Sequence, residues 1–206
     1  MMSSEEKAQF LANRCGKLTA SNIFKVLDRK KNGEKTAAYV QYQHELLAER
    51  LTGFSVPHVV TDAMLFGAEH EDEAADAFVA LTGRDVRLSR TYDHPEIESF
   101  AATPDREIDD GLIEIKVPTS PKFVAWKLAG IVPLEHRPQM LAQLACTRKK
   151  WCGFVAYDPR QKEERHRLFL AKFEPTPEEI AAVEDAARSF LAELDAMFEA
   201  FTTRAA

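Results

Sequence analysis

Hydrophobic residues recur at helical spacing through the first third of the chain and then change to the alternating or clustered spacing of strands. The helical spacing predicts helices at about residues 5–13, 21–27, 36–51 and 62–81. Apolar runs in the middle predict strands at 84–92, 99–103 and 112–117, separated by turn signals at 93–95 and 109–111. Helices are then expected at 121–129 and 138–147, and strands at 151–157 and 167–173. This order favours an α/β fold with a central mixed β-sheet flanked by helices.

The last part of the chain carries its own helix start signal. Thr176 and Glu179 have the spacing of a capping box, and Pro177 suits the first helical position. An apolar stripe follows at helical spacing: Ile180, Val183, Ala187, Phe190, Leu194 and Phe198. We interpret this helix as structural, packed on the sheet. No repeat, low-complexity tract or long linker divides residues 1–206, so one domain is expected.

Composition and charge narrow the functional classes. With 45% hydrophobic and 29% charged residues the chain is an ordinary globular protein. A net charge of -6 argues against nonspecific coating of nucleic acid, although a local basic strip can still bind DNA. Three widely spaced cysteines indicate neither a disulfide framework nor a zinc or iron–sulfur site. No stretch approaches the roughly 20 apolar residues of a membrane span, so a cytoplasmic location is expected.

An acidic and basic pattern lies where two predicted strands follow one another. Asp105 follows the first strand, and Glu114-Ile115-Lys116 lies on the next. Because side chains alternate faces along a strand, Glu114 and Lys116 point the same way. If the turn at 109–111 folds the chain back, Asp105 joins them at one end of the sheet. Two carboxylates then suit Mg²⁺, and the lysine can orient water or stabilise the negative charge that develops in phosphodiester cleavage.

Short patterns of this kind also occur by chance. The alternative interpretation is a pair of acids on a solvated face, with Lys116 as their exposed ion-pair partner. Further segments of the chain bear on this choice.

Several ordered segments resemble one family of nucleases. They are residues 14–21, 67–74, the motif at 105–116, Gln139 in its helix, and 151–160. Residues 14 to about 160 resemble the phage lambda-type exonucleases, also described as the alkaline exonuclease or YqaJ-like viral recombinase family, of the PD-(D/E)xK superfamily. The resemblance implies a restriction-endonuclease-like core in a single nuclease domain over residues 1–206.

The same resemblance implies roles for individual residues. Asp105, Glu114 and the carbonyl of Ile115 would hold Mg²⁺, with Mn²⁺ as a substitute, and Lys116 would be the catalytic lysine. Glu71 would serve a second metal, and whether one or two metals bind stays open. The alternative for Glu71 is a solvated helix face, because it lies in a run of acids that includes Glu69, Asp72, Glu73 and Asp76.

A glutamine that positions water is also implied. Gln139 matches the family position, and Gln143, one helical turn later, is the competing choice. The chain departs from the family at three places: Arg106 stands where glycine is common, Val117 where cysteine is frequent, and His136 where tyrosine often occurs.

DNA-end recognition is expected near the N-terminus. The resemblance assigns the terminal 5′ phosphate to Arg14, Ser21 and Thr103, and the start of the helix near Ser21 would offer N–H groups to that phosphate. The alternative is that Thr19 or Ser21 only caps its helix. The basic loop at Arg29, Lys30 and Lys31 resembles the family loop that inserts into duplex DNA.

The resulting hypothesis is a Mg²⁺-dependent 5′-to-3′ exonuclease that degrades one strand of linear double-stranded DNA and leaves 3′ overhangs for recombination. The resemblance also implies a ring-shaped homotrimer, a single-strand annealing partner, no membrane association, and a phage or prophage origin in a bacterial host. Two rival hypotheses are a site-specific or structure-specific endonuclease of the same superfamily and a noncatalytic DNA-end-binding protein.

Overall fold

A five-stranded mixed sheet forms one half of the molecule. The computed structural model describes residues 4–57 and 59–204. In the order β2-β5-β6-β7-β8, the sheet contains β2 (Arg87–Leu88), β5 (Arg106–Ile108), β6 (Gly111–Lys116), β7 (Trp151–Tyr157) and β8 (Leu168–Phe173). Within this sheet β6 and β7 run parallel, and the other neighbouring strands are antiparallel. β6 is the middle strand of the five.

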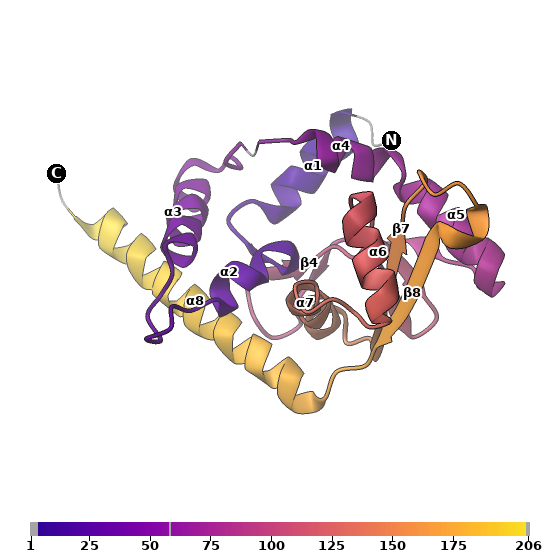
Figure 1. Ribbon diagram of the computed structural model, residues 1–206. Helices are drawn as coiled ribbons and strands as arrows, with labels where there is room; N and C mark the ends of the chain where they lie inside the picture. Colours follow the sequence, from indigo (N-terminus) through magenta and orange to yellow (C-terminus); the bar gives the residue numbers. More distant parts are fainter. Residues whose placement is uncertain (1–3, 58, 205–206) are drawn as a thin grey trace.

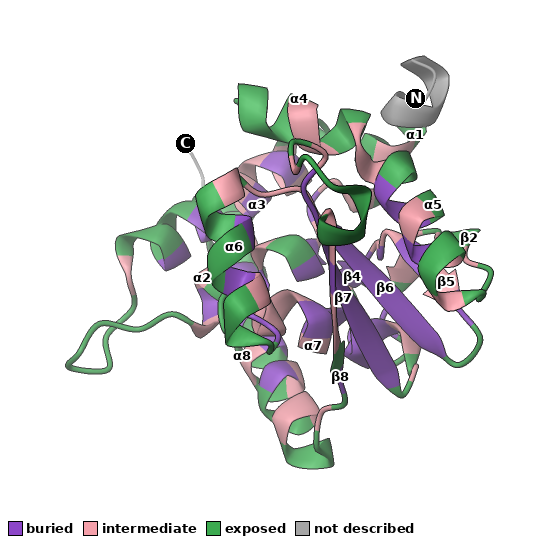
Figure 2. Cartoon of the chain, turned by 45° about the vertical axis from the view of Figure 1, so that its right-hand side comes forward, coloured by how far each residue is buried: buried purple, intermediate pink, exposed green. Residues whose placement is uncertain are grey.

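Helices cover both faces of this sheet (Figure 2). One face packs Leu112, Phe154 and Ala156 against α6 (Ser120–Ala129) and α7 (Arg137–Thr147). The opposite face packs Ile113, Ile115 and Val155 against α5 (Glu71–Thr82). Strands buried on both faces read as continuous apolar runs, as in Trp151–Tyr157, where every residue is buried.

A second core lies among the remaining helices. It joins α2 (Ile23–Leu27), α3 (Ala37–Thr52), α7 and α8 (Pro177–Thr203) around residues such as Tyr42, Phe190 and Leu194. α8 runs along this whole side of the molecule (Figure 1). Its predicted capping box is confirmed, with Glu179 N donating to Thr176 Oγ1 and Thr176 N donating to Glu179 Oε2. The expectation that this helix packs on the sheet is wrong, because α8 packs mainly on α2, α3 and α7.

A small second sheet accompanies the first. It has the order β1-β4-β3, with β1 (Leu18–Thr19) parallel to β4 (Phe100–Ala102) and β3 (Tyr92–Asp93) antiparallel to it. The predicted strand at 99–103 is thus β4, which lies outside the main sheet. The hairpin partner of β6 is β5, which the pattern did not predict because three residues are too few for a periodic signal.

Two predicted elements are wrong in their continuity. The helix expected at 62–81 is divided into α4 (Asp62–Glu69) and α5 at His70, whose φ and ψ of −103° and 6° are not helical. Three acids then open α5, where the helix dipole favours negative charge. The strand expected at 84–92 is divided because its ends pair with different sheets, Leu88 with Arg106 of β5 and Tyr92 with Ala102 of β4.

The N-terminal segment is also more broken than expected. After α1 (Ser4–Arg14) and β1, the helix predicted at 21–27 is a 3₁₀ turn, η1 (Ala20–Asn22), followed by the five-residue α2. A second 3₁₀ turn, η2 (Glu164–His166), precedes β8. The helix expected at 36–51 is confirmed as α3, capped by the Thr36 side chain. None of the helices in the described ranges has the length and hydropathy needed to cross a membrane.

Candidate active site

The β5–β6 hairpin brings Asp105 beside Glu114-Ile115-Lys116. Arg106 pairs with Ile113 and Ile108 with Gly111, so the turn at 109–111 folds the chain back as expected. Asp105 lies just before β5, and its Oδ2 accepts a hydrogen bond from Ile115 N at 2.6 Å. This contact fixes the Asp105 carboxylate at the end of β6.

Glu114 is fully buried in the central strand, with 0% of its surface exposed. One of its oxygens accepts from Lys116 Nζ, and the other accepts from Gln143 Nε2 at 2.5 Å. A buried charge is costly unless it is paired and hydrogen-bonded, and both conditions are met here. The alternative of acids on a solvated face with an exposed lysine therefore does not describe Glu114.

The two carboxylates and the lysine change one another's proton affinity. Burial raises the pKa of Asp105 well above its usual value, and the nearby negative charge of Glu114 adds to this effect. Burial alone would lower the pKa of Lys116, but Glu114 and Asp105 outweigh it and raise that pKa. Lys116 consequently stays protonated across the neutral range, as a cation beside two acids.

The oxygen set at this place fits a hard divalent cation. Asp105, Glu114 and the carbonyl of Ile115 can supply oxygens, and Mg²⁺ characteristically takes one or two carboxylates and keeps several waters. Within residues 4–57 and 59–204, no group of three His, Cys, Asp or Glu side chains is gathered as a metal site. The fit therefore rests on two carboxylates, whose mutual repulsion a divalent cation would relieve.

The predicted glutamines lie one turn apart on α7. Gln143 is fully buried and bonds to Glu114, whereas Gln139 is partly exposed. α7 precedes β7, which runs parallel to β6, so the start of α7 lies toward the Lys116 end of β6. Gln139 is thus nearer that open end, and its expected role with water stays a prediction. Gln143 instead donates a buried hydrogen bond that holds the Glu114 carboxylate in place.

His136 marks the start of α7 and closes this end of the core. Its ring stacks on Phe154 with centroids 5.3 Å apart and meets Trp126 edge-on at 5.0 Å. Burial, followed by the positive charge of Lys116, lowers its pKa to about 4. His136 is therefore neutral at physiological pH and packs as an aromatic residue.

Glu71 reaches the site from the start of α5, on the opposite face of the sheet. Its Oε1 accepts from Arg106 Nη1 at 2.7 Å. The negative charge of Glu71 contributes to raising the pKa values of both Asp105 and Lys116. The acids next to it in the sequence bond to different partners. Glu71 and Asp72 pair with Arg106, while Glu73 accepts from Tyr157 Oη at 2.6 Å.

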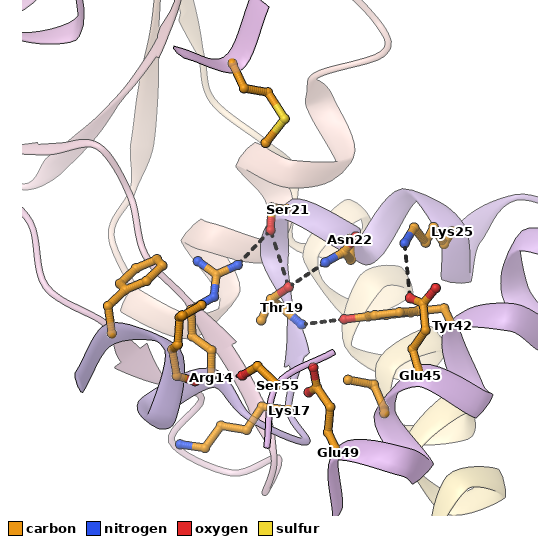
Figure 3. A pocket seen from close by; sticks show the side chains of 14 residues that line it. Arg14, Lys17, Thr19, Ser21, Asn22, Lys25, Tyr42, Glu45, Glu49 and Ser55 are labelled. Carbon is orange, nitrogen blue, oxygen red and sulfur yellow. Dashed lines mark hydrogen bonds and ion pairs between the residues drawn. The ribbon is translucent and has the colours of Figure 1, made fainter. Parts of the chain in front are cut away.

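A second candidate site is a cavity of about 470 Å³ between α1, η1 and α3 (Figure 3). Its polar lining includes Arg14, Lys17, Thr19, Ser21, Asn22 and Lys25. Arg14 Nη2 donates to Ser21 Oγ at 3.0 Å, and its guanidinium lies 4.8 Å from the centroid of the Phe10 ring. The structure therefore brings together two of the three residues expected to bind a phosphate.

The helix start expected near Ser21 is a three-residue 3₁₀ turn, η1, followed by the five-residue α2. Its expected contact with a phosphate stays a prediction. The capping alternative is wrong, because Thr19, at the N-cap of η1, makes no side-chain cap bond and Ser21 lies within that turn. Thr19 Oγ1 instead lies 3.3 Å from Ser21 Oγ and accepts from Asn22 Nδ2 at 3.1 Å.

The small sheet connects this pocket to Asp105. Thr19 pairs with Ala101 in parallel strands. Ser21 and Thr103, each two residues further along the chain, therefore follow the same ends of these two strands. Thr103 Oγ1 lies 2.9 Å from Thr91 Oγ1. Asp105 lies two residues after Thr103, so this short segment connects the end of the small sheet to the carboxylates.

The basic loop is less uniform than its sequence suggests. Arg29 donates to the carbonyl oxygens of Val26 and Asp28 and lies over the Tyr39 ring, so it is tied to the protein surface. Lys30 pairs with Glu34 at 3.2 Å, and Lys31 is exposed. Their predicted contact with DNA stays a prediction.

Two supporting residues carry no signal of their own in the sequence. Asp158, fully buried after β7, accepts from Arg160 Nε at 2.6 Å and from Gln161 Nε2 at 2.7 Å. Arg160 also donates to Pro118 O, just after β6. This network joins the loops that follow the two parallel strands. The hydrophobic pattern predicts the strand at 151–157, and only the family resemblance points to a functional role for residues 151–160.

Comparisons with known proteins identify the family of the chain. Residues 9–150 match the YqaJ-like viral recombinase domain. The alkaline exonuclease LHK-Exo from Laribacter hongkongensis is 35% identical, with a TM-score of 0.86 over 95% of this chain and 96% of that one. LHK-Exo in complex with dAMP gives the same identity and TM-score over 94% and 95%.

A phage related exonuclease from Haemophilus somnus 129PT is 14% identical, with a TM-score of 0.66 over 88% of this chain and 96% of that one, which supports the fold alone. No curated protein matches the chain.

Proposed function

Because the chain belongs to the YqaJ-like viral recombinase domain family and to the alkaline exonuclease group that includes LHK-Exo, we propose that it is a metal-dependent 5′-to-3′ exonuclease acting on the ends of double-stranded DNA. The observation that carries this proposal is the cluster of Asp105, Lys116 and the buried Glu114, with both carboxylates at one end of the central strand. The resulting 3′ overhangs would serve recombination by strand annealing.

Each residue of the cluster has a separate role in this proposal. Asp105, Glu114 and the Ile115 carbonyl would hold Mg²⁺, or Mn²⁺ in its place. The ion, when bound, would lower the pKa of water and offset charge on the phosphoryl oxygens. Lys116, held as a cation by its acidic neighbours, would stabilise charge that develops in the transition state. Gln143 would keep the Glu114 carboxylate in one orientation, and Gln139 would orient the attacking water.

Recognition of the end is assigned to the pocket around Arg14. A guanidinium and two hydroxyl groups, those of Ser21 and Thr19, lie within one hydrogen-bonded set, and Lys25 lines the same cavity. Such donors suit a terminal phosphate. That LHK-Exo forms a complex with dAMP, a nucleoside monophosphate, agrees with recognition of this chemical group. Thr103, which follows the end of β4 in the small sheet, would add a hydroxyl group.

Partners follow from the family rather than from a contact in this chain. We propose a homotrimeric ring around the DNA, a single-strand annealing protein that receives the 3′ strand, and a phage or prophage origin. Exposed apolar side chains on and after α6, Val124, Leu128, Ile131 and Leu134, offer a surface that another chain would cover.

The decisive experiment is digestion of linear duplex labelled at either end, carrying 5′-phosphate or 5′-hydroxyl, with Mg²⁺. We expect loss of the 5′ label first, a preference for the phosphate, and no cleavage by Lys116→Ala. Arg14→Ala should remove the preference while retaining slow cleavage. Lys172→Ala is the matched control, since Lys172 pairs with Gly153 near the start of β7, away from Lys116.

Two results would contradict the proposal. Cleavage of covalently closed circles at a rate similar to that of linear DNA would indicate an endonuclease of the same superfamily. Binding to ends without any metal-dependent cleavage would indicate a noncatalytic end-binding protein.

A further inference from the structure

Arg106 is a buried cation beside the carboxylate cluster. It follows Asp105 directly on β5, and its side chain is 6% exposed. Nη1 donates to Glu71 Oε1 at 2.7 Å and to the Asp105 carbonyl at 2.8 Å, while Nη2 donates to Asp72 Oδ1 at 2.5 Å. The Arg106 guanidinium thus joins the start of α5 to Asp105, the candidate metal ligand.

This arrangement occupies one oxygen, Oε1, of the Glu71 carboxylate. The guanidinium is permanently charged, and its planar fork fixes the geometry of the oxygens that it binds. Glu71, with 36% of its side chain exposed, is held toward the sheet by this bond. An oxygen bound to a buried cation is a poor ligand for a second cation, because the two positive charges would repel at short range.

We propose that the Arg106 guanidinium takes the place of a second metal ion at Glu71. Arg106 is then a positioning residue that holds the start of α5 against Asp105 and limits the site to one divalent ion per chain. The proposal rests on the metal-dependent function proposed above and makes it specific. Glu71 then acts through Arg106 and is not a ligand of a second metal.

Counting bound Mn²⁺ by electron paramagnetic resonance titration of the full chain, without DNA, tests the proposal independently of activity. We expect one ion per chain in the wild type, one in Glu71→Gln, and two in Arg106→Ala, in which Glu71 and Asp105 become free to share an added ion. Arg106→Lys, which keeps the charge, should bind one. Arg87→Ala is the control, because Arg87 lies on the neighbouring edge strand β2 with 72% of its side chain exposed.

Other outcomes would overturn the proposal. Two ions in the wild type that fall to one in Glu71→Gln would show that Glu71 is a metal ligand despite Arg106, and one ion in a folded Arg106→Ala would show that Arg106 does not limit the number. If Arg106→Ala does not fold, the comparison of wild type with Glu71→Gln decides the matter alone. Binding of no ion, together with no cleavage of linear duplex, would instead refute the metal-dependent function.

Discussion

At the scale of single residues, the candidate site depends on how a buried carboxylate is satisfied. Glu114 is enclosed in the central strand and bonds on one side to Lys116 and on the other to Gln143. Removing a partner of a buried charge costs more than the hydrogen bond itself, because the remaining group is left unpaired. The two glutamines of α7 should therefore respond differently to mutation.

Gln143→Ala should lower the free energy of unfolding by about 2–4 kcal/mol, since it removes a buried side chain and leaves a Glu114 oxygen without its donor. Gln139→Ala, at a partly exposed position, should change it by less than about 1 kcal/mol while reducing the cleavage rate. Urea unfolding of both variants, together with single-turnover digestion, makes the comparison. A stable, slow Gln143→Ala beside a fully active Gln139→Ala would reverse the assignment.

His136 should make stability depend on pH. Its pKa is lowered from about 6.5 in the unfolded chain to about 4 in the folded protein by burial and by Lys116. The unfolded chain therefore takes up the proton first, so this contribution to stability is complete above pH 6.5 and is lost as the pH falls toward 4.

After allowance for partial solvent exposure of the ring, the loss should reach about 2 kcal/mol. Replacement by Phe, which keeps the ring stack with Phe154, should flatten this part of the curve. Urea midpoints of wild type and His136→Phe between pH 8 and pH 4.5 provide the measurement. Parallel curves for the two proteins would mean that His136 does not titrate as expected.

At the scale of elements, the hairpin of β5 and β6 places the site. β5 has only three residues, yet it sets Asp105 at the end of β6 and Arg106 under α5. The opposite end of the hairpin depends on a close approach of two residues, because a Cβ on Gly111 would lie 2.3 Å from the Trp151 ring. That ring is held in place by a hydrogen bond from its Nε1 to Asp110 Oδ1 at 3.0 Å.

Gly111→Ala should therefore destabilise the protein by about 1–3 kcal/mol, the usual range for overpacking. Gly67→Ala is the matched control, because Gly67 lies in α4 with no atom within 4 Å of an added Cβ. In a helix that change should be neutral or favourable by up to about 1 kcal/mol. Thermal melts of the two variants give the comparison, and equal melting temperatures would refute the role of the close approach at Gly111.

At the scale of the whole molecule, the small sheet links the N-terminal pocket to the chain segment that leads to the carboxylates. β1 pairs with β4, and β4 leads through Thr103 to Asp105. The overall charge of -6 opposes DNA binding at long range, so the proposed DNA affinity would have to come from local basic groups. We expect the loop with Lys30 and Lys31 to be one such group.

The double change Lys30→Ala and Lys31→Ala should weaken duplex binding and reduce the slope of log K against log salt by about 2, or about 1 for each lysine that neutralises a DNA phosphate. Measurement of duplex affinity at salt concentrations from about 50 to about 200 mM, with Lys116→Ala present to prevent cleavage, tests this expectation. Lys172→Ala in the same background should leave the slope unchanged. An unaltered slope in the double variant would remove this loop from the DNA-binding surface.

The sequence by itself determined most of the helices, the strands at β6, β7 and β8, and the proximity of Asp105 to Glu114 and Lys116, because periodicity and a tight turn act over a few residues. It also identified the family, because several short segments resemble that family in the same order along the chain. Only the tertiary structure decided that Gln143 holds Glu114 across 29 positions and that Arg106 holds Glu71 across 35. Such interactions depend on how α5 and α7 pack on opposite faces of the sheet, which no local pattern specifies.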